Sequence, residues 1–305
     1  GESMGFTLFT LSELSLFLIN TLIKFKDERE KKLLAGLMFF IMFIFAAFRG
    51  SGDADYYNYL WFARDIGTDF SKVMNFSYPV EFSFRLFSYL INILSLSRQW
   101  IIVLMNILSI IPVAFISLKY SPNPFLSALI FLPIFIQFDM QTARTASAVG
   151  LGLISIHSFS EKRWLKSFLF FLFAFSFHRA SIILLPFLFF MSFSIGNLFK
   201  IITAGLAFVI SVFSSFMFRM LANILAAIGL GRMSTKVMTY TFTGKFAGAM
   251  KFYDPRIIFV IALFMTSLMY FNKKSFDKLS MKEASNKAIW FSLLVLLVFR
   301  SSIAI

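Results

Sequence analysis

Residues 24–48 read KFKDEREKKLLAGLMFFIMFIFAAF, a short basic segment followed by a long apolar run. An apolar run of this length, with no charge inside it, is typical of a helix that crosses a lipid bilayer. Five Lys and Arg residues precede the run, and by the positive-inside rule they place residues 24–32 in the cytoplasm. This stretch therefore predicts a membrane span over residues 33–48 together with its orientation.

The composition of the whole chain leads to the same class of protein. Of the 305 residues, 59% are hydrophobic, 14% are charged and 45 are Phe. A soluble domain carries about 25% charged residues, and no single core could bury this much apolar surface. A soluble enzyme, a disordered chain and a coiled coil are excluded, which leaves an all-α, polytopic integral membrane protein.

The net charge of +14 and the absence of Cys narrow the possible functions. In a membrane protein, basic cytoplasmic loops explain such a charge first, and an anionic lipid or phosphate substrate explains it second. We expect no nucleic acid as a partner. A chain without Cys has neither a disulfide framework nor a thiolate metal site.

Hydropathy divides the chain into about ten spans, some of them too short for a straight crossing, so that broken or tilted helices are expected. The expected spans cover residues 6–25, 33–48, 82–97, 99–118, 141–158, 165–177, 180–194, 198–217, 256–272 and 288–305, with 125–138 as a re-entrant or bent segment.

The connections between these spans follow from their charge. Residues 49–80 and 218–254 are expected to be external loops, and the basic loops 159–166 and 273–287 are expected in the cytoplasm. Gly1-Glu2-Ser3 resembles the remnant of a cleaved tag. We therefore take residues 4–305 as a single transmembrane domain.

Charged residues at membrane depth cost several kcal/mol unless they are paired or hydrated, so each is a functional candidate. The predicted topology gathers many of them near the external face. They are Arg49, Asp53, Asp55, Glu81, Arg144, His178, Arg179, Arg232 and Arg300. An Arg-rich cluster beside a His and several carboxylates suits an anionic substrate, because the guanidinium fork matches phosphate oxygens.

Residues 48–59 form the first candidate stretch. Arg49 is followed by a Gly-rich turn, and Asp55, Tyr56 and Tyr59 come after it. The aromatic rings could stack on sugar faces. The alternative is an interfacial aromatic belt beside a solvated acidic loop.

Arg144 and His178 mark the other two stretches. Arg144 lies among small residues, which allow close helix packing around a guanidinium that faces a cavity; alternatively it snorkels from a helix end. His178 interrupts an apolar run, where a neutral imidazole could take a proton from a sugar hydroxyl. The alternative interpretation is that His178 is a hydrogen-bonded core residue without a catalytic role.

Together these stretches resemble the Wzy/EpsG-type bacterial polysaccharide polymerases. The shared pattern is FR at 48–49, DYxxY at 55–59, QxxR at 141–144 and FHRxS at 177–181 with Pro186 after it. The resemblance covers roughly residues 35–190. One departure is the pair Asp53-Ala54, where the family usually has Gly-Thr.

The resemblance implies a GT-C-like membrane glycosyltransferase of the bacterial inner membrane, with a cavity that faces the periplasm. It would transfer a growing glycan, such as the O-antigen of lipopolysaccharide, from undecaprenyl pyrophosphate to the next lipid-linked repeat unit. Membrane lipid and a chain-length regulator protein are further expected partners. Neither a cofactor nor a metal is expected, because Arg can neutralise a pyrophosphate leaving group. Family members are usually longer, so we expect the natural chain to extend beyond residue 305.

The attacking hydroxyl needs a base, and the sequence leaves three candidates open: His178, Asp55 and Glu81. The residues expected to bind substrate are Arg49, Tyr56, Tyr59, Arg144, Arg179, Arg232 and Arg300.

Two other classes of protein remain as alternatives. An O-antigen ligase or another membrane transferase would use similar residues. A flippase or transporter of lipid-linked sugars should show charges through the full membrane depth and paired halves. The charges here gather on one side, which favours surface chemistry.

Overall fold

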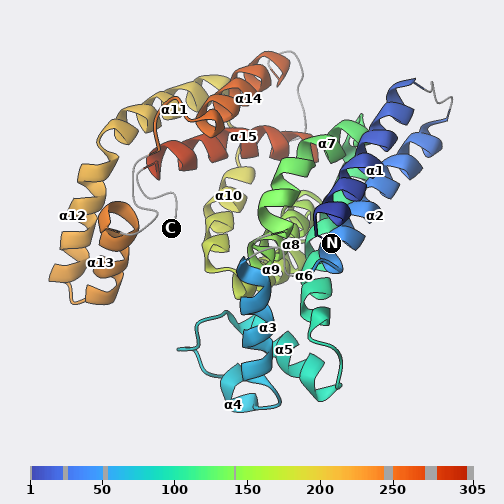
Figure 1. Ribbon diagram of the computed structural model, residues 1–305. Coiled ribbons are helices and arrows are strands. Elements are labelled where there is room, and N and C mark those ends of the chain that lie inside the picture. The colour runs from blue at the N-terminus through green and yellow to red at the C-terminus, as the bar shows by residue number, and fades with distance from the viewer. Residues whose placement is uncertain are drawn as a thin grey trace. The chain divides into compact units, whose positions relative to one another are not determined.

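The computed structural model describes residues 2–22, 27–50, 54–140, 142–243, 250–271 and 280–300 (Figure 1). These described residues form helices joined by turns, with no strand among them. The predicted all-α class is thereby confirmed. The chain forms two compact units, residues 1–184 and residues 185–305.

The first unit begins with α1 (Glu2–Leu22) and α2 (Glu28–Ala47) and continues through short α3 (Ala54–Ile66), α4 (Phe70–Val73) and α5 (Phe82–Ile93). Long α6 (Gln99–Tyr120) follows. Next come α7 (Pro124–Ile134), which continues as the π-helix η1 (Phe135–Asp139), α8 (Ala143–Ser160), α9 (Trp164–Phe177) and the 3-10 helix η2 (Arg179–Ile183). Local signals start several of these helices. Asp27 caps α2, and Asn123 caps α7 just before Pro124.

The helices of the first unit have two common ends. At one end, Gln99 Nε2 donates to the Ala47 carbonyl over 2.8 Å, which joins the end of α2 to the start of α6. Arg49 donates to the Asp139 carbonyl at the same end. Helices α3, α4 and α5 also lie here (Figure 1), so we call this the cap end and these three the cap helices.

The opposite end carries mainly basic side chains, and we call it the basic end. Tyr120, the last residue of α6, contacts His157 near the end of α8 over 3.3 Å. Lys119 pairs with Glu161 over 3.4 Å, and Arg163 pairs with Glu161 over 3.5 Å. Helices α6 and α8 therefore run in the same direction, from the cap end to the basic end.

This arrangement corrects the predicted path of the chain between residues 82 and 124. The prediction that residues 82–97 cross the membrane is wrong, because α2 ends and α6 begins at the cap end. Helix α5 buries one face, which carries Phe84 and Ile91, whereas Leu90 and Ile93 are exposed. Its mean hydropathy suggested a span, but the helix is short and packs against the unit through that face.

Two further corrections follow from the first. The direction of α6 is the reverse of the prediction, so the turn at 121–123 lies at the basic end. Residues 125–138 were expected to be a re-entrant or bent segment. The re-entrant alternative is wrong, because α7 and η1 run alongside α2, with Phe131 against Phe39, and reach the cap end at Asp139. Helix α7 with η1 therefore connects the basic end to the cap end.

A buried core fixes the cap helices to the long helices. Tyr59, Ala63 and Ile66 of α3 belong to one buried cluster with residues of α5, α6, α8 and α9. The rings of Phe87 on α5 and Phe177 on α9 stack at 5.8 Å. The expected loop 49–80 thus contains two helices that pack as an ordered layer.

The second unit contains α10 (Leu184–Met191), α11 (Asn197–Val212), α12 (Ser214–Ala227), α13 (Gly231–Met238), the π-helix η3 (Thr239–Thr243), α14 (Pro255–Phe271) and α15 (Met281–Val298). Helices α11, α14 and α15 share a core around Trp290. The Trp290 indole donates to Thr203 over 2.9 Å. Helices α12, α13 and η3 together occupy most of the expected loop 218–254.

Membrane-crossing potential is concentrated in a few helices. Among the described residues, α6 alone is long and apolar enough to span a bilayer, and α11 with α12 would add a second span if this pair, bent by 74°, is one unit. Shorter apolar helices cover 7–19, 124–139, 164–177, 179–191 and 255–270. These short and broken helices agree with the expectation that some spans are short or broken. That the chain has about ten spans stays a prediction.

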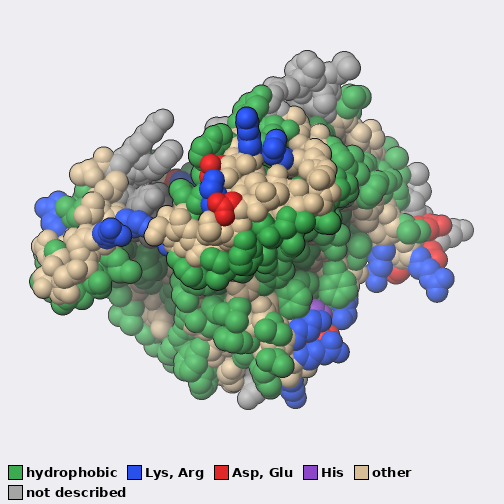
Figure 2. All heavy atoms as spheres, turned by 90° about the horizontal axis from the view of Figure 1, so that it is seen from below, with side chains coloured by type: hydrophobic (Ala, Val, Ile, Leu, Met, Phe, Trp, Pro, Cys, Tyr) green, Lys and Arg blue, Asp and Glu red, His purple; other side chains and the backbone are tan. Residues whose placement is uncertain are grey.

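The outer surface is strongly apolar. Hydrophobic side chains cover much of the face in Figure 2, and charged side chains gather there in a few separate groups. On α9, for example, Leu165 and Leu169 are more than half exposed. Exposed apolar surface of this extent is typical of a protein that is surrounded by lipid.

Candidate active site

Glu81 is the centre of a cluster at the cap end. It stands just before α5, and its carboxylate turns away from its own helix to accept a hydrogen bond from the Arg144 guanidinium. The other carboxylate oxygen, Oε1, lies 4.0 Å from Nδ1 of His178. The three side chains retain 16%, 26% and 34% of their exposure, in the order Glu81, Arg144 and His178. They are therefore partly desolvated yet reachable.

Arg144 is positioned by the close packing of α8 on α6. The Ser147 hydroxyl donates to the Met105 carbonyl over 2.9 Å. At Gly150 the main chains approach so closely that a Cβ atom would overlap the Leu108 carbonyl. This confirms the prediction that small residues near Arg144 allow close packing. The contact fixes the start of α8, and with it the guanidinium.

His178 stands outside the helices, between the end of α9 and the start of η2. The hydroxyls of Ser176 and Ser83 meet at 2.5 Å and tie this end of α9 to α5. Burial lowers the pKa of His178, the Glu81 carboxylate opposes that effect, and Arg144 adds to it. The net shift is downward, so the imidazole is neutral at neutral pH and can accept a proton.

Tyr59 forms the floor of the cluster. Its ring is 2% exposed and lies under the Arg144 guanidinium, 5.8 Å from ring centre to the guanidinium carbon. The Asp55 carboxylate, one helical turn earlier, is near enough for its charge to act on Tyr59. Tyr56 donates to Gln99 over 2.8 Å and so links α3 to α6.

Not every predicted site residue joins this cluster. Arg49 is buried at the same end, but it contacts Asp139 at the end of η1. Arg179 follows His178 and is exposed. Asp53 and Gln141, which belong to the motifs discussed above, lie outside the described residues.

Arg232 and Arg300 belong to the second unit. Arg232 is exposed on α13. Arg300 donates to the carbonyls of Met250 and Ser211 over 2.7 and 2.9 Å, and it stacks 4.1 Å from the Phe252 ring centre. These contacts give Arg300 a role in holding its own unit together. Substrate binding by Arg232 and Arg300 stays a prediction.

The sequence interpretation missed Arg85. Its side chain is 2% exposed, donates to the Asn75 carbonyl and lies close enough to Glu81 and Arg179 for their charges to act on it. Arg85 lies in the first turn of α5, directly after Glu81, which precedes the helix. A charge inside an expected span was itself the signal that could have identified it.

The described part of the chain is therefore an all-helical protein with an apolar surface and an Arg–Glu–His cluster at one end. The chain matches the model of the EpsG family over residues 32–305, and it belongs to that family. The match extends well beyond the motif region of residues 35–190. Family membership points to a polysaccharide polymerase. No curated protein and no solved structure matches the chain.

Proposed function

We propose that this protein polymerises oligosaccharide repeat units carried on undecaprenyl pyrophosphate, at the periplasmic face of the bacterial inner membrane. Membership in the EpsG family supports the polymerase activity. The observation that carries the mechanism is the position of Glu81, which contacts Arg144 with one oxygen and faces His178 with the other.

In the proposed step, the bond between the anomeric carbon of the growing glycan and its pyrophosphate oxygen breaks. A new glycosidic bond forms between that carbon and a hydroxyl of the incoming repeat unit. The hydroxyl proton moves to Nε2 of His178, because Nδ1 faces Glu81. Glu81 keeps the proton of the resting imidazole on Nδ1 and stabilises the imidazolium as it forms.

The leaving pyrophosphate needs positive charge more than it needs a proton. Arg179 is exposed beside His178 and, among the described residues, its guanidinium has neither an ion pair nor a hydrogen bond. Arg144 keeps further N–H donors beside the one that it gives to Glu81. We assign the pyrophosphate to these two guanidinium groups, which can neutralise it without a metal ion. Asp55, which is half-buried, is left to bind the acceptor sugar, whereas Tyr59 is buried under Arg144 and supports its guanidinium.

The orientation of the protein follows from the basic end. Residues 27–32 lie at the start of α2, and residues 161–166 cover the turn between α8 and α9 and the start of α9, at the end opposite to the cluster. Basic segments of this kind remain in the cytoplasm. The cap end would then face the periplasm, where lipid-linked units are joined.

The test is turnover of purified protein with lipid-linked repeat units, measured as a ladder of products. His178→Gln keeps hydrogen bonding but loses proton acceptance, so we expect turnover to fall by about 10²–10⁴-fold. His157→Gln is the matched control, because His157 is the only other His in the chain and lies at the basic end. Chelation of divalent cations should leave turnover intact. A folded His178→Gln protein with normal turnover would contradict the mechanism.

A further inference from the structure

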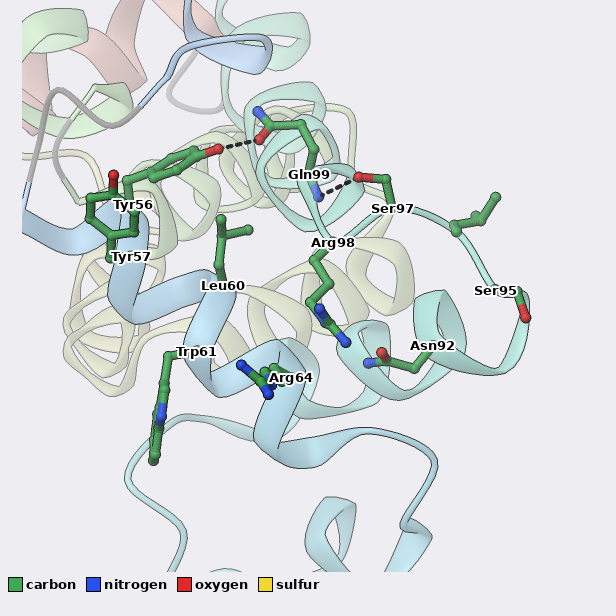
Figure 3. Close-up of a pocket in the computed structure, with 11 residues that line it drawn as sticks. Tyr56, Tyr57, Leu60, Trp61, Arg64, Asn92, Ser95, Ser97, Arg98 and Gln99 are labelled. Atoms are coloured by element: carbon green, nitrogen blue, oxygen red, sulfur yellow. Dashed lines mark hydrogen bonds between the residues drawn. The ribbon is translucent and has the colours of Figure 1, made fainter.

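An opening lies between α3 and residues 92–99 (Figure 3). Its volume is about 800 Å³. Tyr57, Trp61 and Arg64 line it at spacings of four and three residues, which puts them on one face of α3. Tyr59, two residues from Tyr57 and from Trp61, points to the opposite face. We call this opening the α3 groove.

Two arginine side chains enter the groove. Arg64 and Arg98 point into the space between α3 and the segment 92–99 (Figure 3). Within the described ranges, neither guanidinium has an ion pair, a hydrogen bond or a ring contact, and no carboxylate lines the groove. Two unpartnered cations that face one space favour an anionic ligand.

The nearest carboxylate to Arg64 in the sequence is already engaged. Asp65 accepts a hydrogen bond from Tyr78 over 2.6 Å and pairs with Lys72 over 3.1 Å. These contacts hold the pKa of Asp65 below its usual range, with the Tyr78 bond as the main cause. Asp65 therefore stays charged but is turned toward its own partners, and it does not neutralise Arg64.

The other walls of the groove suit a sugar ring. Trp61 and Tyr57 are 59% and 61% exposed, and an exposed aromatic face offers an apolar platform with a polar edge. The amide nitrogen of Asn92 donates to the carbonyls of Ala63 and Ser88 over 2.8 and 2.7 Å. Its oxygen is left as an acceptor for a sugar hydroxyl.

The groove is also preorganised. Helix α5 ends in a Schellman motif, in which Leu96 N–H bonds to the Ile91 carbonyl and Ser95 N–H to the Asn92 carbonyl, both at 3.0 Å. Ser95 takes the left-handed conformation of this motif, with φ of 52°. Gln99 fixes the adjoining wall, because it accepts from Tyr56 and donates to Ala47. A wall held in this way binds a ligand with little loss of conformational entropy.

We propose that the α3 groove binds an acidic sugar residue, one that carries a carboxylate, within the glycan on which the active site acts. Arg64 and Arg98 would hold the carboxylate, and Trp61 and Tyr57 would contact the sugar ring. The inference rests on the proposed function, and it adds a substrate class to it. A lipid headgroup shares the negative charge, so the experiment includes a measurement that distinguishes it from a sugar.

The experiment measures binding of trigalacturonate, an acidic trisaccharide probe, to the full chain in nanodiscs of zwitterionic lipid. Each of Arg64→Gln and Arg98→Gln should weaken binding about 10-fold or more, as expected for loss of a charge-assisted hydrogen bond. Arg29→Gln is the matched control, because Arg29 is exposed at the basic end. Unchanged affinity in a folded Arg64→Gln/Arg98→Gln double variant would overturn the proposal.

Two further measurements distinguish failure of the groove proposal from failure of the proposed function and from binding of lipid. His178→Gln should bind the probe normally while losing turnover. Suppose that probe affinity is unchanged in the Arg64→Gln and Arg98→Gln variants while His178→Gln loses turnover. That result would reject the groove as a sugar site and keep the proposed function. In nanodiscs that contain phosphatidylglycerol, the probe should still bind. Displacement of the probe by this lipid would identify a headgroup site and overturn the proposal.

Discussion

Oε1 of Glu81 lies 4.0 Å from Nδ1 of His178, while Oε2 of the same carboxylate is held by Arg144. The charge state of His178 therefore depends on both neighbours. Glu81 raises the pKa of His178, and Arg144 lowers it together with burial, which is the largest cause. A general base must be neutral, so the rate should fall as the pH drops through this lowered pKa.

The first prediction concerns this acid limb of the pH–rate profile. In the wild type it should lie below the ordinary His value of about 6.5. Glu81→Gln removes the charge that raises the pKa, so the limb should move to lower pH. Arg144→Gln removes a charge that lowers the pKa, so the limb should move to higher pH. Limbs that coincide in all three proteins would show that His178 is not the titrating base.

The second prediction concerns the shape of the Arg144 side chain. Arg144→Lys keeps a positive charge near Glu81 but loses the planar fork and the stacking on Tyr59. Turnover should fall about 10-fold or more, in line with the loss of one charge-assisted hydrogen bond. The measurement is steady-state turnover at equal protein level. If Arg144→Ala makes glycan of normal length and amount, Arg144 has no role in the reaction.

The third prediction concerns the contact between α6 and α8. In Gly150→Ala, the new Cβ would overlap the Leu108 carbonyl and lie 2.8 Å from Cα of Ser109, so the helices must separate. We expect a loss of about 1–3 kcal/mol in the free energy of unfolding, together with lower turnover because Arg144 shifts.

Gly36→Ala is the control for that change. Its Cβ would lie 3.9 Å from Leu118, an ordinary contact, in the interior of α2. Ala is the better helix former by about 1 kcal/mol, so this variant should be as stable as the wild type or more stable. Equal stability of the two variants, followed by thermal unfolding in detergent, would argue against the close approach of α6 and α8.

The fourth prediction concerns the direction of α6. The chain has no Cys, so single cysteines report accessibility without background. Thr68→Cys at the cap end should react with an impermeant thiol reagent added to intact spheroplasts, whereas Pro122→Cys and Lys162→Cys should be shielded. The hydropathy interpretation predicted an external Pro122. Reaction of Pro122→Cys without reaction at Lys162→Cys would restore that interpretation.

The sequence predicted the helical class and the residues of the cluster because both depend on local signals. Arg144 among small residues and His178 at a helix junction are visible without a structure. The charge-based topology placed Glu81 at the same face as Arg144 and His178. Their direct contacts depend on how α5, α8 and α9 pack, and that information is not local.

The errors of interpretation had a common origin in averaged hydropathy. Over residues 82–97 the average hides the buried Arg85 and the end of α5 at Ile93. Helix α3 was taken for a loop because it is polar overall. Its buried positions Tyr59, Ala63 and Ile66 nevertheless follow helical spacing, as expected for one buried face. Periodicity is therefore the better guide for helices at the membrane surface.

The bond between Gln99 and Ala47 has an evolutionary consequence. It brings the entry and the exit of residues 48–98 together, so that the cap helices form an insertion between two adjacent points. Within this insertion the exposed face of α3 lies outside the core and away from Glu81, so substitutions there should cost little stability. Substitutions at Tyr57, Trp61 and Arg64 leave the buried face of α3 intact. Under the proposed role of the α3 groove, the choice of glycan can therefore change through one face of one short helix, while the reaction chemistry is retained.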